Sequence, residues 1–175
     1  MKILATCILS VTALFGKPTQ VQGTTQYGDV TVEAIEGSGI VKLRGTKVGR
    51  IQLTGNLLAD DADIGTFDIT GAANLTDTKV ANPSKMMGYL QAKNCTFEDE
   101  LTILNQKATF TNTKLDKITV EKDAAFRGKQ LIELKQNSLA NGLIRFEGGN
   151  GEVVVYPGSQ VLDAVRGGKV VKSSP

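Results

Sequence analysis

Apolar residues recur along the middle of this 175-residue chain in the order apolar-x-x-apolar-x-apolar, where x is mostly polar or small. Alternation with a period of two is typical of a β-strand that buries one face. Because the spacing is kept while the residue types change, the pattern indicates an internal repeat. Three clear copies and one weaker copy are Val48/Ile51/Leu53, Ile64/Phe67/Ile69, Leu115/Ile118/Val120 and Met87/Leu90/Ala92.

A second pattern follows the first and reads small-x-bulky-x-(Asp, Asn or Gly)-x-x-aliphatic. Asp, Asn and Gly tolerate left-handed backbone, so this position predicts a tight corner. The aliphatic anchors recur at a nearly constant spacing, but the longer step from Val80 to Leu101 predicts an insertion at 81–86, where Pro83 marks an irregular loop. The four segments are AANLTDTKV from Ala72, CTFEDEL from Cys95, ATFTNTKL from Ala108 and AAFRGKQL from Ala124.

Short strands joined by corners at a fixed period predict an all-β fold, a single-stranded β-solenoid (β-helix) with rungs of about 16 residues. Equivalent apolar positions would then line one narrow core, and helical content would be very low. The alternative is a β-sandwich with short hairpins, which favours longer strands and less regular spacing.

The two ends of the chain differ from the repeat. The N-terminal MKILATCILSVTALFGKPTQVQG has an apolar run, Ile3 to Phe15, of the length of a signal-peptide core and too short to span a bilayer. We therefore predict a signal peptide over 1–23, a solenoid domain over 24–168, a flexible tail over 169–175, and a periplasmic or secreted protein without a membrane span. The alternative for the first residues is a buried N-terminal helix or strand.

Composition narrows the possible chemistry. The chain has no histidine, which excludes Ser-His-Asp and Cys-His mechanisms built from this chain alone. Cleavage after Gly23 would remove Lys2 and Lys17, so 20 Lys and Arg residues become 18, equal to the 18 Asp and Glu residues. No basic stripe with interleaved aromatics is present, and we predict no nucleic-acid partner. Cys95 would be the one remaining cysteine, and its small-residue slot predicts an inert buried thiol.

Two candidate sites follow from the residues. Asp60, Asp61 and Asp63 offer carboxylate oxygens for calcium, with a solvated corner as the alternative; no other metal and no cofactor is predicted. Near the C-terminus, Ile144/Phe146 and Val153/Val155 flank EGGNGE, which forms either a hairpin turn or a solenoid corner. Open solenoid ends recruit other chains unless they are covered, so Val153 and Val155 are the candidate residues for self-association.

The short Gly-rich strands of GRIQLTGNLLADDADIGTFDITGAANL and the closing RFEGGNGEVVVYPGSQV resemble the bactofilins, polymer-forming β-helical scaffold proteins of bacteria. The resemblance covers about residues 28–168. It implies a triangular, right-handed β-helix that joins end to end without nucleotide. Bactofilins usually lack a signal peptide, so the predicted signal peptide departs from the family.

Together these features predict an exported, non-catalytic structural or interaction protein that assembles through its end rungs. Its partners would be further copies of itself in a homopolymer, or an envelope protein or glycan. The first alternative is an adhesin-like or glycan-binding module that uses one face. The second is a polysaccharide-active enzyme, because paired carboxylates on β-helices hydrolyse glycans.

Overall fold

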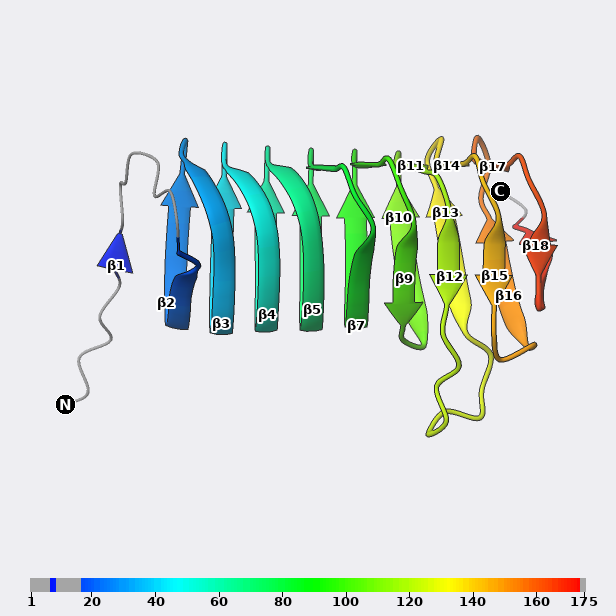
Figure 1. Cartoon of the computed structure of the whole chain (residues 1–175). Helices are drawn as coiled ribbons and strands as arrows, with labels where there is room; N and C mark the ends of the chain where they lie inside the picture. The colour runs from blue at the N-terminus through cyan, green and yellow to red at the C-terminus, as the bar shows by residue number, and fades with distance from the viewer. Residues whose placement is uncertain (1–6, 9–16, 174–175) are drawn as a thin grey trace.

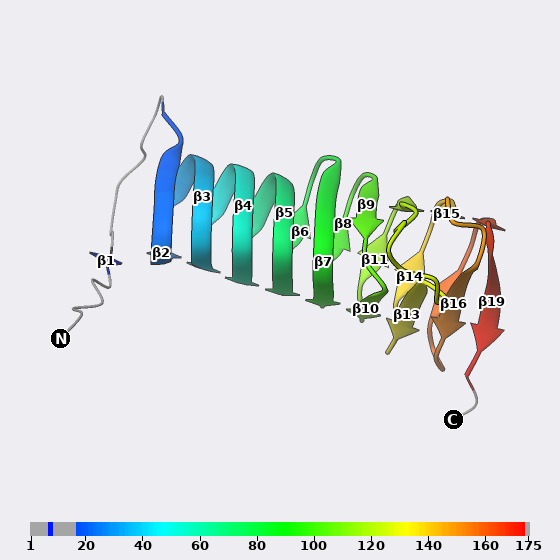
Figure 2. The ribbon, with the colours of Figure 1, turned by 90° about the horizontal axis from the view of Figure 1, so that it is seen from below.

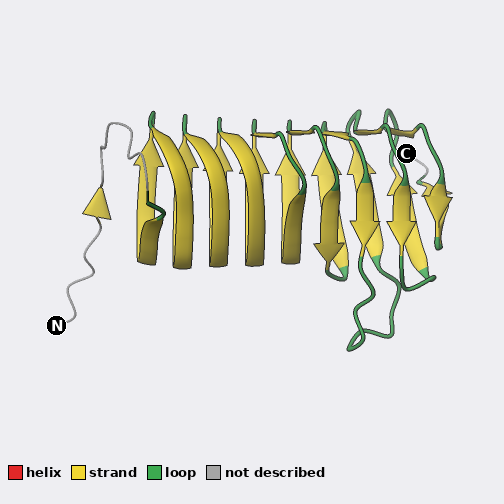
Figure 3. Ribbon diagram, viewed as in Figure 1, coloured by secondary structure: helices red, strands yellow, loops and turns green. Residues whose placement is uncertain are grey.

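The computed structural model describes residues 7–8 and 17–173. Within this part of the chain the strands stack in parallel as a β-solenoid of about nine turns with rungs of about 17 residues (Figure 1). All regular structure in these residues is strand, and no helix occurs (Figure 3). The predicted fold class is therefore confirmed, and the parallel ladders exclude the alternative of a sandwich built from antiparallel sheets.

Each turn has three sides, which we call the first, second and third face in chain order. The first strands bend around more than one face, whereas later turns are divided into short separate strands (Figure 2). A two-residue strand, β1 (Cys7–Ile8), pairs with Thr25 and Gln26 of β2. The strands that bend are β2 (Thr19–Gly28), β3 (Thr31–Arg44), β4 (Lys47–Asp60), β5 (Asp63–Thr76) and β7 (Ser84–Lys93).

The other strands each belong to one face. On the first face they are β6 (Lys79–Val80), β8 (Thr96–Phe97), β11 (Lys114–Leu115), β14 (Leu139–Ala140) and β17 (Gln160–Val161). On the second face they are β9 (Leu101–Leu104), β12 (Ile118–Val120), β15 (Ile144–Phe146) and β18 (Val165–Arg166). On the third face they are β10 (Lys107–Thr111), β13 (Leu131–Lys135), β16 (Gly151–Val155) and β19 (Gly168–Lys172).

The core is built from columns of residues that occupy the same position in successive rungs. Val48 lies between Val32 and Ile64, and Ile51 and Leu53 stack on Phe67 and Ile69 in the same register. These side chains are buried in one continuous apolar cluster. The column through Val48 contains Val32, Val48, Ile64, Val80, Phe97, Leu115, Ala140 and Val161.

The corner between the third and first faces uses the predicted residue types. Asp61, Asp77 and Asn112 all have φ near +50°, the left-handed conformation that Asp, Asn and Gly tolerate best. Two amides link the rungs at this corner: Asn94 Nδ2 donates to Asp77 Oδ1, and Asn112 Nδ2 donates to Asn94 Oδ1, both at 2.9 Å. The residue after each corner is small and mostly buried, and this column contains Thr46, Ala62, Thr78, Cys95, Thr113, Ser138 and Ser159.

Parts of the predicted repeat register are wrong. Leu90 pairs with Ala73, and Ala92 pairs with Leu75, so the weaker copy Met87/Leu90/Ala92 belongs to the second pattern. The anchor Leu101 pairs with Ile118 on the second face and does not join the Leu115 column. Cys95 follows a corner residue and does not share the column of Ala73 and Ala108.

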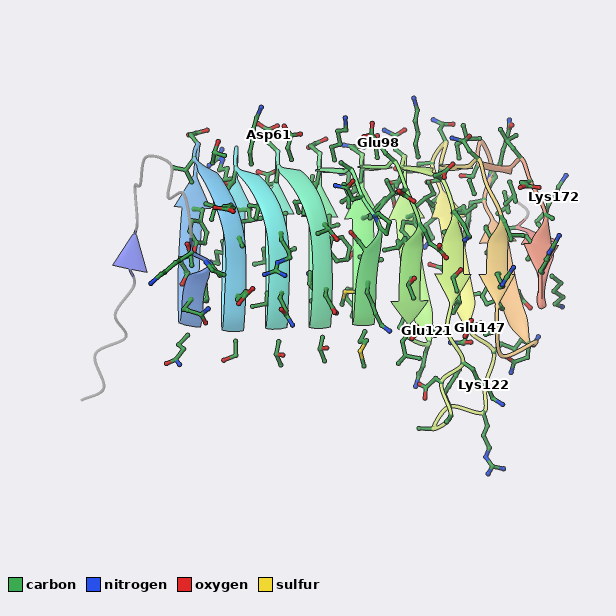
Figure 4. The ribbon with its side chains drawn as sticks, viewed as in Figure 1. Asp61, Glu98, Glu121, Lys122, Glu147 and Lys172 are labelled. Carbon is green, nitrogen blue, oxygen red and sulfur yellow. The ribbon has the colours of Figure 1, made fainter. Side chains whose placement is uncertain are left out.

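The insertion also lies elsewhere. Leu53 pairs with Ile69, and Ile69 in turn pairs with Met86, so residues 81–86 lengthen their rung by a single residue. The long connection is 121–130 between β12 and β13, and it accounts for the large separation in sequence between Lys107 and its partner Leu131. It contains most of AAFRGKQL and projects beyond the coil in Figure 1, and Figure 4 shows Lys122 within it.

The strands pass the predicted domain boundaries at both ends. β2 begins at Thr19, before the predicted cleavage point after Gly23, and β19 continues to Lys172, inside the predicted tail. The EGGNGE segment is a solenoid corner, because β15 and β16 pair in parallel with different strands. The apolar core of the predicted signal peptide lies almost entirely outside the described residues.

Candidate functional site

The three aspartates of the predicted calcium site are not gathered around one point. Asp60 ends β4, Asp61 occupies the left-handed corner and Asp63 begins β5. All three are exposed, and the Asp63 carboxylate lies 3.6 Å from Lys47 Nζ. In residues 7–8 and 17–173, no group of three or more His, Cys, Asp or Glu side chains is arranged to hold a metal ion. The calcium hypothesis therefore has no geometric support in this part of the chain.

The structure places Val153 and Val155 one rung inside the C-terminal end. Both belong to β16, and β19 covers them, with Val153 paired to Val170 and Val155 paired to Lys172. Both valines are buried. A charged residue at either position would disrupt the core, so such a variant would not test whether an exposed surface mediates self-association. The better candidate surface for self-association is the last rung.

The last described rung, formed by β17, β18 and β19, has no described rung stacked on its outer side, and we call it the open rung. Among the described strands β19 pairs only with β16, so the backbone groups along its other edge have no strand partner. Val170 is 46% exposed and Leu162 is 61% exposed. Val161 and Val165 are partly buried against the core from the same side.

Comparison along one column shows how unusual Val170 is. From Val41 to Val153 every residue of this column is almost completely buried, because a rung lies on each side of it. Val170 has a described rung on one side only, which leaves apolar surface and strand edge exposed together. The column contains Val41, Leu57, Ala73, Leu90, Ala108, Ile132, Val153 and Val170.

A second candidate site is a surface pocket at the corner between the second and third faces, where the regular coil meets the projecting loop. Earlier rungs have glycine at this corner, and the last of these is Gly88. In the next rung Leu104 pairs with Met87, so Asn105 takes the position of Gly88. The pocket has a volume of about 390 Å³ and is lined by Gly88, Tyr89, Leu104, Asn105, Gln106, Lys107 and Asp123.

An ion-pair cluster fixes one wall of this pocket. Glu133 is buried on the third face, and its carboxylate lies 3.0 Å from Lys107 Nζ and 2.9 Å from Lys135 Nζ. Burial opposes ionisation of Glu133, but hydrogen bonds from Lys135 and Lys107 outweigh it and lower the pKa of the carboxyl. Lys107 is therefore held by Glu133 at the edge of the pocket.

Sequence analysis did not identify Tyr89 or Asn105 as site residues. One signal in the sequence could have indicated this site. Glycine occupies the same corner position in successive rungs, and the series ends where Asn105 takes that position after Gly39, Gly55, Gly71 and Gly88. An Asp from a loop in the following rung, Asp123, completes the lining. That contribution depends on the path of the loop and has no local sequence signal.

Cys95 is enclosed as expected for an inert thiol. Its Sγ donates to the Lys93 carbonyl oxygen at 3.1 Å, and the side chain is buried. Burial raises the pKa of the Cys95 thiol from 9.0 to about 11. The folded-state pKa of the thiol lies above its ordinary value, so ionisation of Cys95 does not affect the stability of the fold below pH 9. As the pH rises from 9 towards 11, the buried neutral thiol lowers the free energy of unfolding.

We expect an alkylating reagent at pH 8 to modify Cys95 at least about 100-fold more slowly in the folded protein than in denaturant, because only the exposed thiolate reacts. Peptide mapping by mass spectrometry measures this rate and separates Cys95 from Cys7. A folded-state rate within about tenfold of the denatured rate would contradict the buried position of the thiol.

The fold defines the chain as a parallel β-solenoid protein with an open C-terminal rung and a corner pocket. In residues 7–8 and 17–173 no helix is long and apolar enough to cross a membrane. Searches against protein-family models, curated proteins and solved structures find no match to this chain.

Proposed function

We propose that this chain is an exported, non-catalytic structural protein that associates with copies of itself through its end rungs. The observation that carries the proposal is the last rung, where Val170 and Leu162 are exposed beside a strand edge that has no partner among the described strands. Adding a parallel strand to such an edge satisfies its backbone hydrogen bonds and buries its apolar residues.

The basic residues of the last rung make this association selective. Lys169 and Lys172 lie on β19, and Figure 4 shows Lys172 at the C-terminal end of the coil. Lysines on an edge strand oppose indiscriminate pairing. By contrast, β2 at the other end of the coil has the sequence TQVQGTTQYG and carries no charge. After cleavage at Gly23, which would remove Lys17 and the β1 strand that pairs with Thr25 and Gln26, the remaining β2 residues could receive a basic strand without like-charge repulsion.

The resemblance to the bactofilins agrees with this role, because it implies end-to-end polymers. Export rests on the N-terminal sequence. Cleavage after Gly23 would remove β1 together with Thr19–Gly23, which pair with Ile35–Gly39, and would leave those β3 residues as a second open edge. Cell fractionation with sequencing of the mature N-terminus tests export and locates the cleavage point.

We expect Val170→Glu to raise the concentration at which the protein self-associates by at least about tenfold, because a carboxylate would have to be buried between rungs. Light scattering with negative-stain microscopy across a concentration series measures this.

The matched control is Val171→Glu, which changes the adjacent residue on the same strand. Alternation places residue 171 on the opposite side of the strand, with Val154, away from the core. This variant should associate like the unmodified protein. A protein that stays monomeric at every concentration, or a Val170→Glu variant that associates unchanged, would contradict the proposal.

A further inference from the structure

We propose that the corner pocket at Tyr89 and Asn105 binds a neutral saccharide ring. The ligand class follows from three features of the pocket: an exposed aromatic ring, a buried amide nitrogen without a partner among the described residues, and one side chain of each charge. This inference does not depend on self-association, because the pocket lies in the middle of the coil and the open rung lies at its end.

Tyr89 provides the aromatic wall. Its side chain is 50% exposed on the third face, and its hydroxyl donates to Gln91 Oε1 at 3.0 Å, which holds the ring in place. The face of an aromatic ring carries partial negative charge and attracts polarised C–H groups. The C–H groups on one side of a pyranose ring are polarised by the neighbouring oxygens, so a sugar can stack on Tyr89.

Asn105 provides an unsatisfied donor. The residue is only 8% exposed, and its Nδ2 has no hydrogen-bond partner in the described part of the chain. A buried amide without a partner is costly and is uncommon in folded proteins. The terminal torsion of asparagine is soft, and rotation about it would be required to turn the buried Nδ2 towards a ligand hydroxyl.

The charged groups favour a neutral ligand with hydroxyls. Asp123 accepts from the Ala125 backbone N–H at 2.9 Å through one carboxylate oxygen, and a carboxylate has further acceptor capacity. On the other side, Lys107 is already paired with Glu133. An anion such as phosphate would meet the carboxylate of Asp123, and the lysine that lines the pocket is already neutralised. A hydroxyl both donates and accepts, so it can use Asp123 and Asn105 together.

The dimensions agree with a small ligand. A volume of about 390 Å³ lies at the lower end of the range for small-molecule sites, and the pocket is open to solvent.

The test titrates the full chain with neutral oligosaccharides of glucose, galactose, mannose and N-acetylglucosamine, and with inorganic phosphate as the anionic comparison. Binding is followed by calorimetry and by the NMR signal of the Asn105 side-chain amide. We expect at least one oligosaccharide to bind and to shift this amide signal. We expect Tyr89→Ala to weaken that binding by roughly tenfold or more, as loss of an aromatic stack does, and Tyr89→Phe to keep it within a few-fold.

The control is Leu58→Ala, which removes an exposed apolar side chain that does not line this pocket. It should leave saccharide binding unchanged. Three outcomes would overturn the proposal: no oligosaccharide binds at about 10 mM, the weak end for a small open site; Tyr89→Ala binds as well as the unmodified protein; or phosphate binds and shifts the Asn105 amide while the saccharides do not.

Discussion

Gly55→Ala is expected to lower the free energy of unfolding by about 3–5 kcal/mol, because a methyl group has no space between the rungs at this corner. Gly55 has φ of +142°, a conformation that residues with a side chain rarely adopt, and an added Cβ would lie 2.0 Å from the Gly39 carbonyl oxygen. The rungs cannot easily separate, since Gly39 is stacked on Gly23 and Gly71 on Gly55 in the same way. A backbone shift that relieved the clash at Gly55 would therefore have to be repeated at the stacked glycines of the neighbouring rungs.

Urea unfolding monitored by circular dichroism measures this loss. Gly149→Ala is the matched comparison, because Gly149 has a positive φ of +73° but an added Cβ would meet nothing within 4 Å. It should cost only about 1 kcal/mol, the cost of the left-handed backbone alone. Equal losses in the two variants would show that backbone conformation decides stability and that close stacking does not.

Phe110→Ala should destabilise the protein by about 3–5 kcal/mol, the usual cost of removing a buried phenylalanine from a core. Phe110 is completely buried, and its ring meets Phe97 edge to face, with the centroids 6.1 Å apart and an interplanar angle of 87°. The core is enclosed within one narrow coil, so few neighbouring side chains can move into the cavity that the ring would leave. Thermal and urea unfolding both measure the effect.

Phe126→Ala is the matched comparison, and it tests whether the segment around Phe126 packs as a rung of the repeat. Phe126 has the same place in its sequence pattern as Phe110, but it lies in the 121–130 loop and is only partly buried. We expect a loss below about 1 kcal/mol, as for a side chain outside the core. A loss as large as that of Phe110→Ala would mean that residues 124–131 pack as a rung.

The fold could be predicted because a solenoid repeats one simple requirement. Each rung must place apolar residues where its neighbours place theirs, and Val48/Ile51/Leu53, Ile64/Phe67/Ile69 and Leu115/Ile118/Val120 all stack in that register. The corners could also be predicted from local sequence, because Asp77 and Asn112 tolerate the left-handed backbone that turns the chain without help from distant residues.

The positions of the loops could not be predicted from these patterns. AAFRGKQL satisfies the spacing of small and bulky residues, yet the Phe126 ring packs on its own turn, so close that a Cβ on Gly128 would lie 2.4 Å from it. A local pattern cannot show whether a neighbouring rung is present to cover it. The same reason applies to Asn105, whose burial is produced by residues of other turns.

The glycine corner has a consequence for the length of the molecule. From β3 to β5 the rungs pair residue by residue with glycine stacked on glycine, so a rung is an interchangeable unit about 4.8 Å high. Whole rungs can be added or removed there without altering what lies at either tip. The distance between the two ends of the coil would therefore change by one rung height, about 4.8 Å, for each rung added to or removed from the segment between β3 and β5.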